Sequence, residues 1–87
     1  MRYEARIEVS HRPGVLDPQG ATVERALPAL GYEHVRDVRI GKCIRLELDA
    51  ADRAAARAAV ESMCERLLVN PVIEAYEIEL TELAPVS

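Results

Sequence analysis

The stretch of this sequence that most resembles a ligand-binding loop is a run of glycines and prolines around an aspartate. The run "RPGVLDPQGATVERAL" covers residues 12–27 and leads into a predicted helix. A phosphate loop needs several backbone N–H groups that converge at a helix start, as in G-x-x-x-x-G-K-[ST] or G-x-G-x-x-G. Here Gly14 and Gly20 are far apart, no Lys-Ser or Lys-Thr pair follows, and the two prolines lack N–H donors. Asp17 would also place a carboxylate where the anion should lie, so the run predicts a turn and a helix start rather than a nucleotide site.

The other side chains that often perform catalysis are isolated from one another. His11 and His34 have no second ligand at a metal-like spacing and are predicted to be surface or loop residues. Glu77 and Glu79 lie two apart on a predicted strand, so we expect them to face solvent rather than to form a catalytic pair. The serines are Ser10, Ser62 and Ser87, and none lies in a G-x-S-x-G elbow. The sequence therefore predicts no catalytic, cofactor-binding or metal-binding residue.

One small basic group could still bind an anion or an acidic partner surface. Lys42 is the only lysine of the chain, and three arginines follow or precede it closely: Arg36, Arg39 and Arg45. Cross-strand pairing of these arginines with Asp37 and Glu47 is the alternative that we favour.

Composition narrows the class of protein. A net charge of −4 argues against a general nucleic-acid binder, which needs a basic face. No apolar run approaches the length of a membrane span, and the first residues, "MRYEARIEV", do not form a signal peptide. Cys43 and Cys64 are single and far apart, so we expect buried, reduced thiols in a cytoplasmic protein.

The first half of the chain predicts a strand and a capped helix. Residues 2–10 alternate between apolar and charged side chains, as in a strand with one wet face. Asp17 and Pro18 are typical of an N-cap and a first helical position, and Gly31 supplies a C-terminal stop. Pro28 removes a helical hydrogen bond, so we expect a kink or a loosened last turn there. The apolar stripe of this helix is Val23, Ala26, Leu27 and Leu30.

Residues 33–40 and 43–49 are predicted to be two strands joined in a hairpin around Gly41 and Lys42. A two-residue turn would place Val38 and Ile40 on the face opposite to Ile44, whereas a three-residue loop would place all of them on one face. The sequence leaves this register open. The first arrangement would leave apolar surface for a partner.

The second half predicts a long helix and a last strand. Residues 52–69 are rich in helix formers, with Asp49 or Asp52 as the cap and a buried stripe of Ala56, Val60, Met63 and Leu67. Asn70 and Pro71 end the helix, and residues 72–80 form a strand. The order β-α-β-β-α-β predicts a ferredoxin-like α+β fold: an antiparallel sheet with both helices on one face, assembling into oligomers. We expect one domain over residues 1–81 and a frayed tail over residues 82–87.

Four segments follow one another in the chain: "RPGVLDPQGATVERAL", "LGY", "VRIGK" and "LLVNPVIEAYEIE". Together they resemble the PurS family, the small subunit of bacterial and archaeal phosphoribosylformylglycinamidine synthase. The resemblance covers nearly the whole chain, and His11 and Pro28 depart from the usual pattern. It marks these residues as the family signature and as candidate partner contacts: Pro13, Gly14, Asp17, Gln19, Gly20, Gly41, Lys42, Asn70, Pro71 and Glu74.

The resemblance implies a bridging subunit of a complex in de novo purine biosynthesis, with no catalytic groups of its own. It implies homodimers or homotetramers that join a glutaminase subunit, PurQ, to a large synthetase subunit, PurL, and support ammonia transfer between them. ATP, Mg and glutamine would be used by those partners, and this chain would hold no cofactor. We expect no nucleic-acid or membrane partner.

The "RPGVL" stretch after a strand is also similar to ACT regulatory domains, which bind amino acids at a loop and helix start. "DPQG" and "NPVIE" are not part of that pattern. An ACT-like binding module is therefore the alternative prediction.

Overall fold

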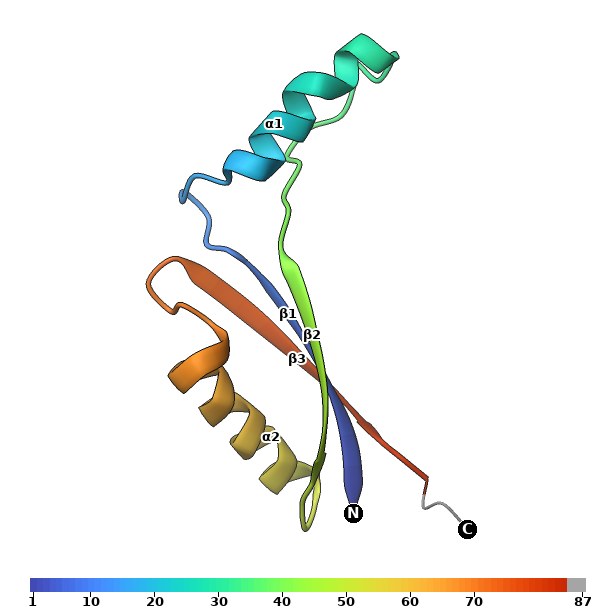
Figure 1. The fold of residues 1–87 in the computed structure, drawn as a ribbon, viewed down its shortest axis with the longest axis vertical. Helices are drawn as coiled ribbons and strands as arrows, with labels where there is room; N and C mark the ends of the chain where they lie inside the picture. The colour runs from blue at the N-terminus through green and yellow to red at the C-terminus, as the bar shows by residue number, and fades with distance from the viewer. Residues whose placement is uncertain (85–87) are drawn as a thin grey trace.

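A three-stranded antiparallel sheet forms the centre of the computed structural model, which describes residues 1–84. The strands are β1 (Arg2–His11), β2 (Lys42–Asp49) and β3 (Glu74–Glu82), and β1 lies between the other two. Helix α1 (Pro18–Ala26) follows β1, and helix α2 (Arg53–Met63) follows β2. The predicted α+β class, with an antiparallel sheet and two helices, is confirmed (Figure 1). No helix in residues 1–84 has the length and apolar character needed to cross a membrane.

The core lies between α2 and one face of the sheet. The apolar positions of β1 are Tyr3, Ala5, Ile7 and Val9, and all of them are buried, as their alternation predicts. From α2 come Ala56 and Val60, and from the following turn Cys64. Burial of these apolar side chains is the main stabilising contribution in a chain of this size.

Helix α2 begins as predicted but ends differently. The Asp52 carboxylate accepts a hydrogen bond from Ala55 N at 2.7 Å and so caps the helix. After Met63 the chain widens into a π-helical turn, η2 (Cys64–Leu68). A π turn contains an extra residue, so it rotates the apolar face. After Cys64 the next buried position is consequently Val69, five residues on, and the prediction of a buried Leu67 was wrong, since this side chain is 83% exposed.

Helix α1 has the predicted ends. Asp17 caps it, Pro18 is its first residue, and the α-helix stops at Ala26. A 3₁₀ turn, η1 (Leu27–Leu30), contains Pro28 and ends at Gly31 in the left-handed conformation with φ 96°. The loosened last turn predicted at Pro28 is thus confirmed. The apolar stripe of α1, however, is largely exposed to solvent.

Two details of the predicted arrangement were wrong. In residues 1–84 the segment 33–40 is not a strand, and Gly41 and Lys42 do not form a hairpin turn, because β2 starts at Lys42 and pairs with β1. The amide groups of this segment bond to α1 instead: Val38 N donates to Glu24 and Ile40 N donates to Asp17. Donors that are used in this way are not available to a neighbouring strand.

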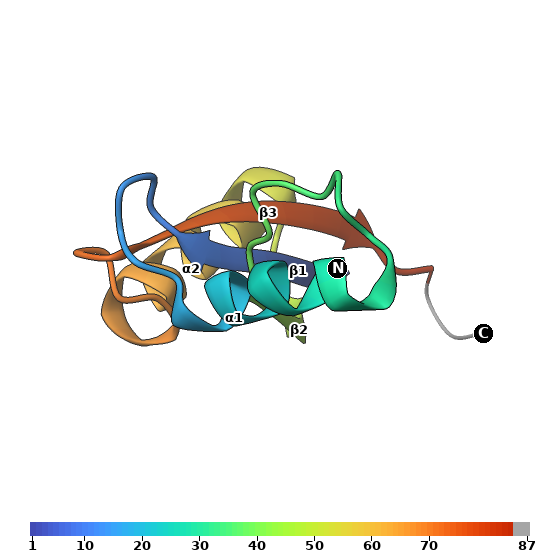
Figure 2. The same cartoon turned by 90° about the horizontal axis from the view of Figure 1, so that it is seen from above.

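The second difference is that only α2 covers the sheet. Helix α1 and the segment that returns from it form an arm, residues 16–41, that stands off the end of the sheet (Figures 1 and 2). The radius of gyration is 17.0 Å, whereas a compact chain of this length would have about 12 Å. The side of β2 next to the core, with Ile44, Leu46 and Leu48, is therefore only half-buried.

The predicted tail, residues 82–87, begins inside β3, which runs to Glu82. Residues 85–87 lie outside the described residues.

Candidate functional site

The signature residues predicted as partner contacts gather at one end of the sheet, where it meets the arm (Figure 1). They lie where β1 ends, where β2 and β3 begin, and where the arm leaves the sheet. We call this region the junction and define it as residues 11–20, 38–42 and 70–74. All ten predicted positions belong to it: Pro13, Gly14, Asp17, Gln19, Gly20, Gly41, Lys42, Asn70, Pro71 and Glu74.

The turn after β1 is fastened to the turn before β3. Val15 N donates to Arg12 O at 3.1 Å, which closes a tight turn in which Gly14 has φ 84°. Arg12 N donates to Ile73 O at 2.8 Å, and Arg12 Nε donates to Pro71 O at 2.9 Å. The residues of these turns therefore position two loops side by side. The sequence analysis missed Arg12, although it stands inside the stretch that was singled out.

Glu74 organises the turn before β3. Its carboxylate accepts a hydrogen bond from Asn70 N at 2.8 Å, and the Asn70 side chain accepts one from Val72 N at 3.2 Å. Lys42 Nζ lies 3.9 Å from the other carboxylate oxygen of Glu74, whose side chain is only 17% exposed. This lysine of β2 thus pairs across β1 with a residue of β3 rather than being free to hold an anion.

Within the arm, Asp17 joins the start of helix α1 to the segment that returns from it. One carboxylate oxygen accepts a hydrogen bond from Gly20 N at 2.9 Å, and the other accepts one from Ile40 N at 2.8 Å. These two backbone donors hold the pKa of Asp17 below its ordinary value, because they stabilise the ionised form. Glu24 adds a bond from Val38 N at 3.0 Å, a contact for which the sequence offered no signal. The carboxylate of Asp17 occupies the helix start, as predicted, and leaves no place for a phosphate.

Two glycines are required for close approach of backbones at the junction. A Cβ atom on Gly20 would lie less than 3.0 Å from Val38 O, and one on Gly41 would lie less than 3.0 Å from Val9 O. Any side chain would therefore separate α1 from the returning segment, or β2 from β1. These signature glycines serve the shape of this chain.

Other signature residues face solvent and remain candidates for contact with a partner. Pro13, Gln19 and Pro71 are exposed. Gln19 borders a shallow patch with Pro18, Thr22, Val23 and Ile40. The loop at Pro71 continues into Val72, which is 79% exposed.

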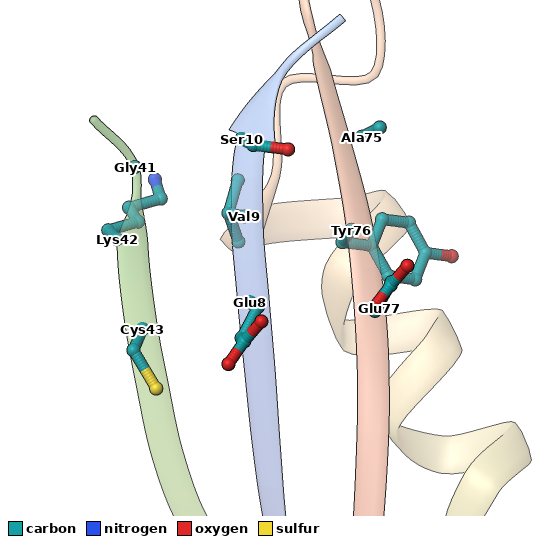
Figure 3. A pocket seen from close by; sticks show the side chains of 9 residues that line it. All are labelled: Glu8, Val9, Ser10, Gly41, Lys42, Cys43, Ala75, Tyr76 and Glu77. Carbon is teal, nitrogen blue, oxygen red and sulfur yellow. The ribbon is translucent and has the colours of Figure 1, made fainter. Parts of the chain in front are cut away.

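An open depression of about 540 Å³ crosses the three strands beside the junction (Figure 3). It contains Glu8 and Ser10 from β1, Cys43 from β2 and Glu77 from β3, on the face opposite to the core. Cys43 is exposed, so the prediction that it is buried was wrong, because it alternates with the apolar residues of β2. Cys64 is buried, and both cysteines are free.

A second hollow, of about 240 Å³, lies between the turn after β1 and the arm. His11, Asp17, Asp37 and Arg39 are among the residues that line it. His11 is half-buried rather than at the surface, and within residues 1–84 its Nδ1 atom is buried without a hydrogen-bond partner.

Two potential nucleophiles of the described residues, Cys64 and Tyr76, have raised pKa values. Residues 1–84 contain no group of three or more His, Cys, Asp or Glu side chains that could hold a metal ion. Burial raises the pKa of the Cys64 thiol. A hydrogen bond at 2.8 Å to Glu65 raises the pKa of Tyr76 to about 12. Both groups therefore stay protonated at neutral pH and are poor nucleophiles.

The predicted basic group does not form either. Arg45 lies on the polar face of β2, whereas Lys42 lies on the opposite face and reaches Glu74. Arg36 and Arg39 belong to the arm. The favoured cross-strand pairing of Arg36, Arg39 and Arg45 with Asp37 and Glu47 was also wrong, since residues 33–40 do not form a strand and Arg6 of β1 lies opposite Arg45.

A model of the PurS family, described as phosphoribosylformylglycinamidine (FGAM) synthase, matches residues 4–82. The chain belongs to the PurS family. The family match decides against the alternative of an ACT-like module.

Curated PurS proteins and solved PurS structures are similar to the chain over most of its length. The PurS subunit of Synechocystis sp. is 51% identical over 93% of this chain and 81% of that protein. The PurS subunit of Bacillus subtilis is 44% identical over 93% and 95%. The structure of PurLQS from Thermotoga maritima contains a chain that matches with a TM-score of 0.85 at 40% identity, covering 93% of this chain and 99% of that one. The chain therefore shares its overall fold with a solved PurS chain over nearly its whole length.

Proposed function

We propose that this PurS chain is the non-catalytic bridging subunit of a phosphoribosylformylglycinamidine synthase in de novo purine biosynthesis. It joins the glutaminase subunit PurQ to the ATP-dependent synthetase subunit PurL and supports the transfer of ammonia between them. The observation that carries the proposal is the match to a chain of the Thermotoga maritima PurLQS structure, at a TM-score of 0.85 and 40% identity.

The chemistry of this chain supports a role without catalysis. An amidation that uses ATP and glutamine needs a phosphate-binding site and an activated nucleophile. In residues 1–84 the glycine-rich run is filled by its own Asp17 carboxylate, and the buried Cys64 has a raised pKa. ATP, Mg and glutamine are accordingly bound by the partner subunits, and this chain carries no cofactor.

The surface of the chain supports assembly with other chains in the cytoplasm. The arm exposes apolar side chains, with Leu16 at 75% and Leu30 at 72% exposure, and the loop before β3 exposes Val72. Apolar side chains that are exposed on an arm away from the core are available for contacts with other chains. The chain therefore works as a homodimer or homotetramer that offers surfaces to PurL and PurQ.

Analytical ultracentrifugation of PurL and PurQ with and without this chain tests the bridging role. We expect a complex of all three proteins and no stable complex of PurL with PurQ alone at the same concentrations. A PurL–PurQ complex that forms equally well without this chain would overturn the proposal. The variant Val72→Asp tests the exposed loop, with Ala51→Asp in the exposed turn between β2 and α2 as the control that adds the same charge. We expect only the loop variant to weaken the complex.

A further inference from the structure

His11 lies at the joint between the sheet and the arm. It is the last residue of β1, and the chain turns toward α1 directly after it (Figure 1). Its side chain lines the second hollow, between that turn and the arm. Two chain segments connect the arm to the sheet, one before α1 and one before β2, and residues of both line the hollow. A bond formed across this hollow would therefore restrict how the arm swings on the sheet.

The imidazole of His11 has one nitrogen without a partner. Its Nδ1 atom is buried, and no group of residues 1–84 forms a hydrogen bond with it. A polar atom that is buried without a hydrogen bond is costly, so few of them occur in folded proteins. A neutral imidazole can present a lone pair at this nitrogen, whereas in the protonated ring both nitrogens carry a hydrogen and Nδ1 becomes a donor. Protonation of His11 thus creates a buried donor that requires an acceptor.

Charged groups face His11 from the arm, from the turn and from the sheet. The carboxylates of the arm that line the hollow with it are Asp17, Glu24 and Asp37. In the sheet, Glu74 of β3 lies directly opposite His11. The positive groups are Arg12 of the turn, Arg39 of the arm and Lys42 of β2, which pairs with Glu74. The acceptor for a protonated imidazole must come from among the carboxylates of the arm and of β3.

One of these carboxylates is uncommitted. Asp17, Glu24 and Glu74 each accept a hydrogen bond from a backbone N–H group. Asp37, in contrast, forms no ion pair and accepts no hydrogen bond within residues 1–84. Its backbone has φ 55°, a left-handed conformation that aspartate and asparagine adopt more readily than most residues. Asp37 is thus the acceptor that the hollow leaves free.

We propose that His11 and Asp37 form a pH-sensitive latch between the sheet and the arm. When the imidazole takes up a proton from solvent, its Nδ1–H group donates a hydrogen bond to the Asp37 carboxylate and fastens the returning segment of the arm to the end of β1. As pH rises and the proton leaves, the bond is lost and the arm is released. Histidine is the side chain whose charge ordinarily changes between about pH 5 and 8. The latch belongs to the isolated chain and does not depend on its role in a synthase.

The latch acts on the arm as a whole. The returning segment is already held to α1 by Asp17 and Glu24, so fastening Asp37 also fixes the helix. The direction in which the arm presents its exposed apolar side chains, among them Leu16, then depends on pH. Asp17 stays ionised above about pH 5, because two backbone donors hold its pKa below the ordinary value. A change between pH 5.5 and 8 therefore does not come from Asp17.

An NMR titration of the full chain between pH 5.5 and 8 tests the pair, with His34→Gln used to assign the imidazole signals of His11. Asp37→Asn removes the charge and keeps a residue that tolerates the left-handed conformation, so the fold is retained. The proton affinity of His11 should fall about 2- to 5-fold in this variant, as expected for a partly exposed ion pair. Asp49→Asn, at the far end of β2, is the matched control and should not change it. An equal proton affinity of His11 with and without Asp37→Asn would overturn the proposal.

Backbone amide relaxation by NMR measures the motion of the arm independently. At pH 5.5 the amides of α1 and β1 should relax as one body, and at pH 8 those of α1 should show additional motion. His11→Gln should show this motion at both pH values, whereas His11→Lys, which is charged at both, should show it at neither. Equal motion of the arm at pH 5.5 and 8 in the unaltered chain would refute the latch, as would a His11→Lys arm that moves as freely as the His11→Gln arm.

Discussion

Replacing Gly20 with alanine should detach the returning segment of the arm from α1. Gly20 is buried, and a Cβ atom there would lie less than 3.0 Å from both Val38 O and the Asp17 carboxylate. The helix and the segment would have to move apart by roughly 1 Å to reach an ordinary contact distance. Such a shift takes the bond from Ile40 N to Asp17, now 2.8 Å, outside hydrogen-bonding range.

The expected size of the effect follows from two opposing contributions. Inserting a methyl group into a closely packed site costs about 1–3 kcal/mol. Alanine is a better helix former than glycine and returns up to about 1 kcal/mol. Because the added methyl group would meet a backbone oxygen, we place its cost in the upper part of that range, at about 2–3 kcal/mol. The net loss of about 1–2 kcal/mol corresponds to a fall in melting temperature of about 4–16 °C for a chain of this length.

Urea denaturation gives the free energy of unfolding, and amide hydrogen exchange by NMR locates the change. The amides of Val38 and Ile40 should lose protection in Gly20→Ala, while those of β1 should keep theirs. Gln19→Ala is the control, because this side chain is exposed in the same helical turn and its removal should change stability by less than about 0.5 kcal/mol. A Gly20→Ala protein that is as stable as the unaltered chain, with Ile40 still protected, would refute this account of the junction.

Three further outcomes follow from other contacts. The pKa of Asp17 lies below the ordinary 3.8, so the hydrogen bond from Ile40 N to its carboxylate should hold above that pH and weaken as pH falls through the lower pKa of the folded state. Amide exchange of Ile40 as a function of pH measures this effect, and Asp17→Asn should abolish the pH dependence. Tyr76→Phe should remove the phenol that ionises at about pH 12 in an ultraviolet titration, and an unchanged titration curve would contradict this assignment. The stabilisation from the bond of Tyr76 to Glu65 should be present below pH 10 and disappear as pH rises through about 12. Val60→Ala should lower the free energy of unfolding, measured by urea denaturation, by about 2–3 kcal/mol, because this fully buried side chain loses two methyl groups and leaves a cavity. A loss below about 0.5 kcal/mol would mean that α2 does not pack on the sheet as described.

Local signals in the sequence predicted the features that depend on neighbouring residues. The alternation of β1 predicted its buried face, and Asp17 predicted the start of α1. The pair Asp49 and Asp52 offered two caps for α2, of which Asp52 is the cap, and Pro28 predicted a kink or a loosened last turn, which is the 3₁₀ turn. Each of these depends on a cap, a period or a missing donor that acts within a few residues.

Features that depend on distant contacts were not predictable in the same way. Residues 33–40 have the apolar alternation of a strand, yet their amides bond to Asp17 and Glu24 of α1. The same alternation is compatible with a strand or with an extended segment hydrogen-bonded to a helix, and only the three-dimensional arrangement decides between them. The candidate site behaved similarly. The signature positions do gather at one junction, but Gly20 and Gly41 turned out to be packing residues, whereas Gln19 and Pro71 face solvent.

The central claim is that this chain couples a glutaminase to a synthetase without catalysing either reaction. The most direct measurement is the rate of phosphoribosylformylglycinamidine synthesis by PurL and PurQ, with glutamine or with ammonia as nitrogen donor, in the presence and absence of this chain. The account predicts that the glutamine-dependent rate falls sharply without the chain, while the ammonia-dependent rate changes much less. A glutamine-dependent rate that is full without this chain would contradict it.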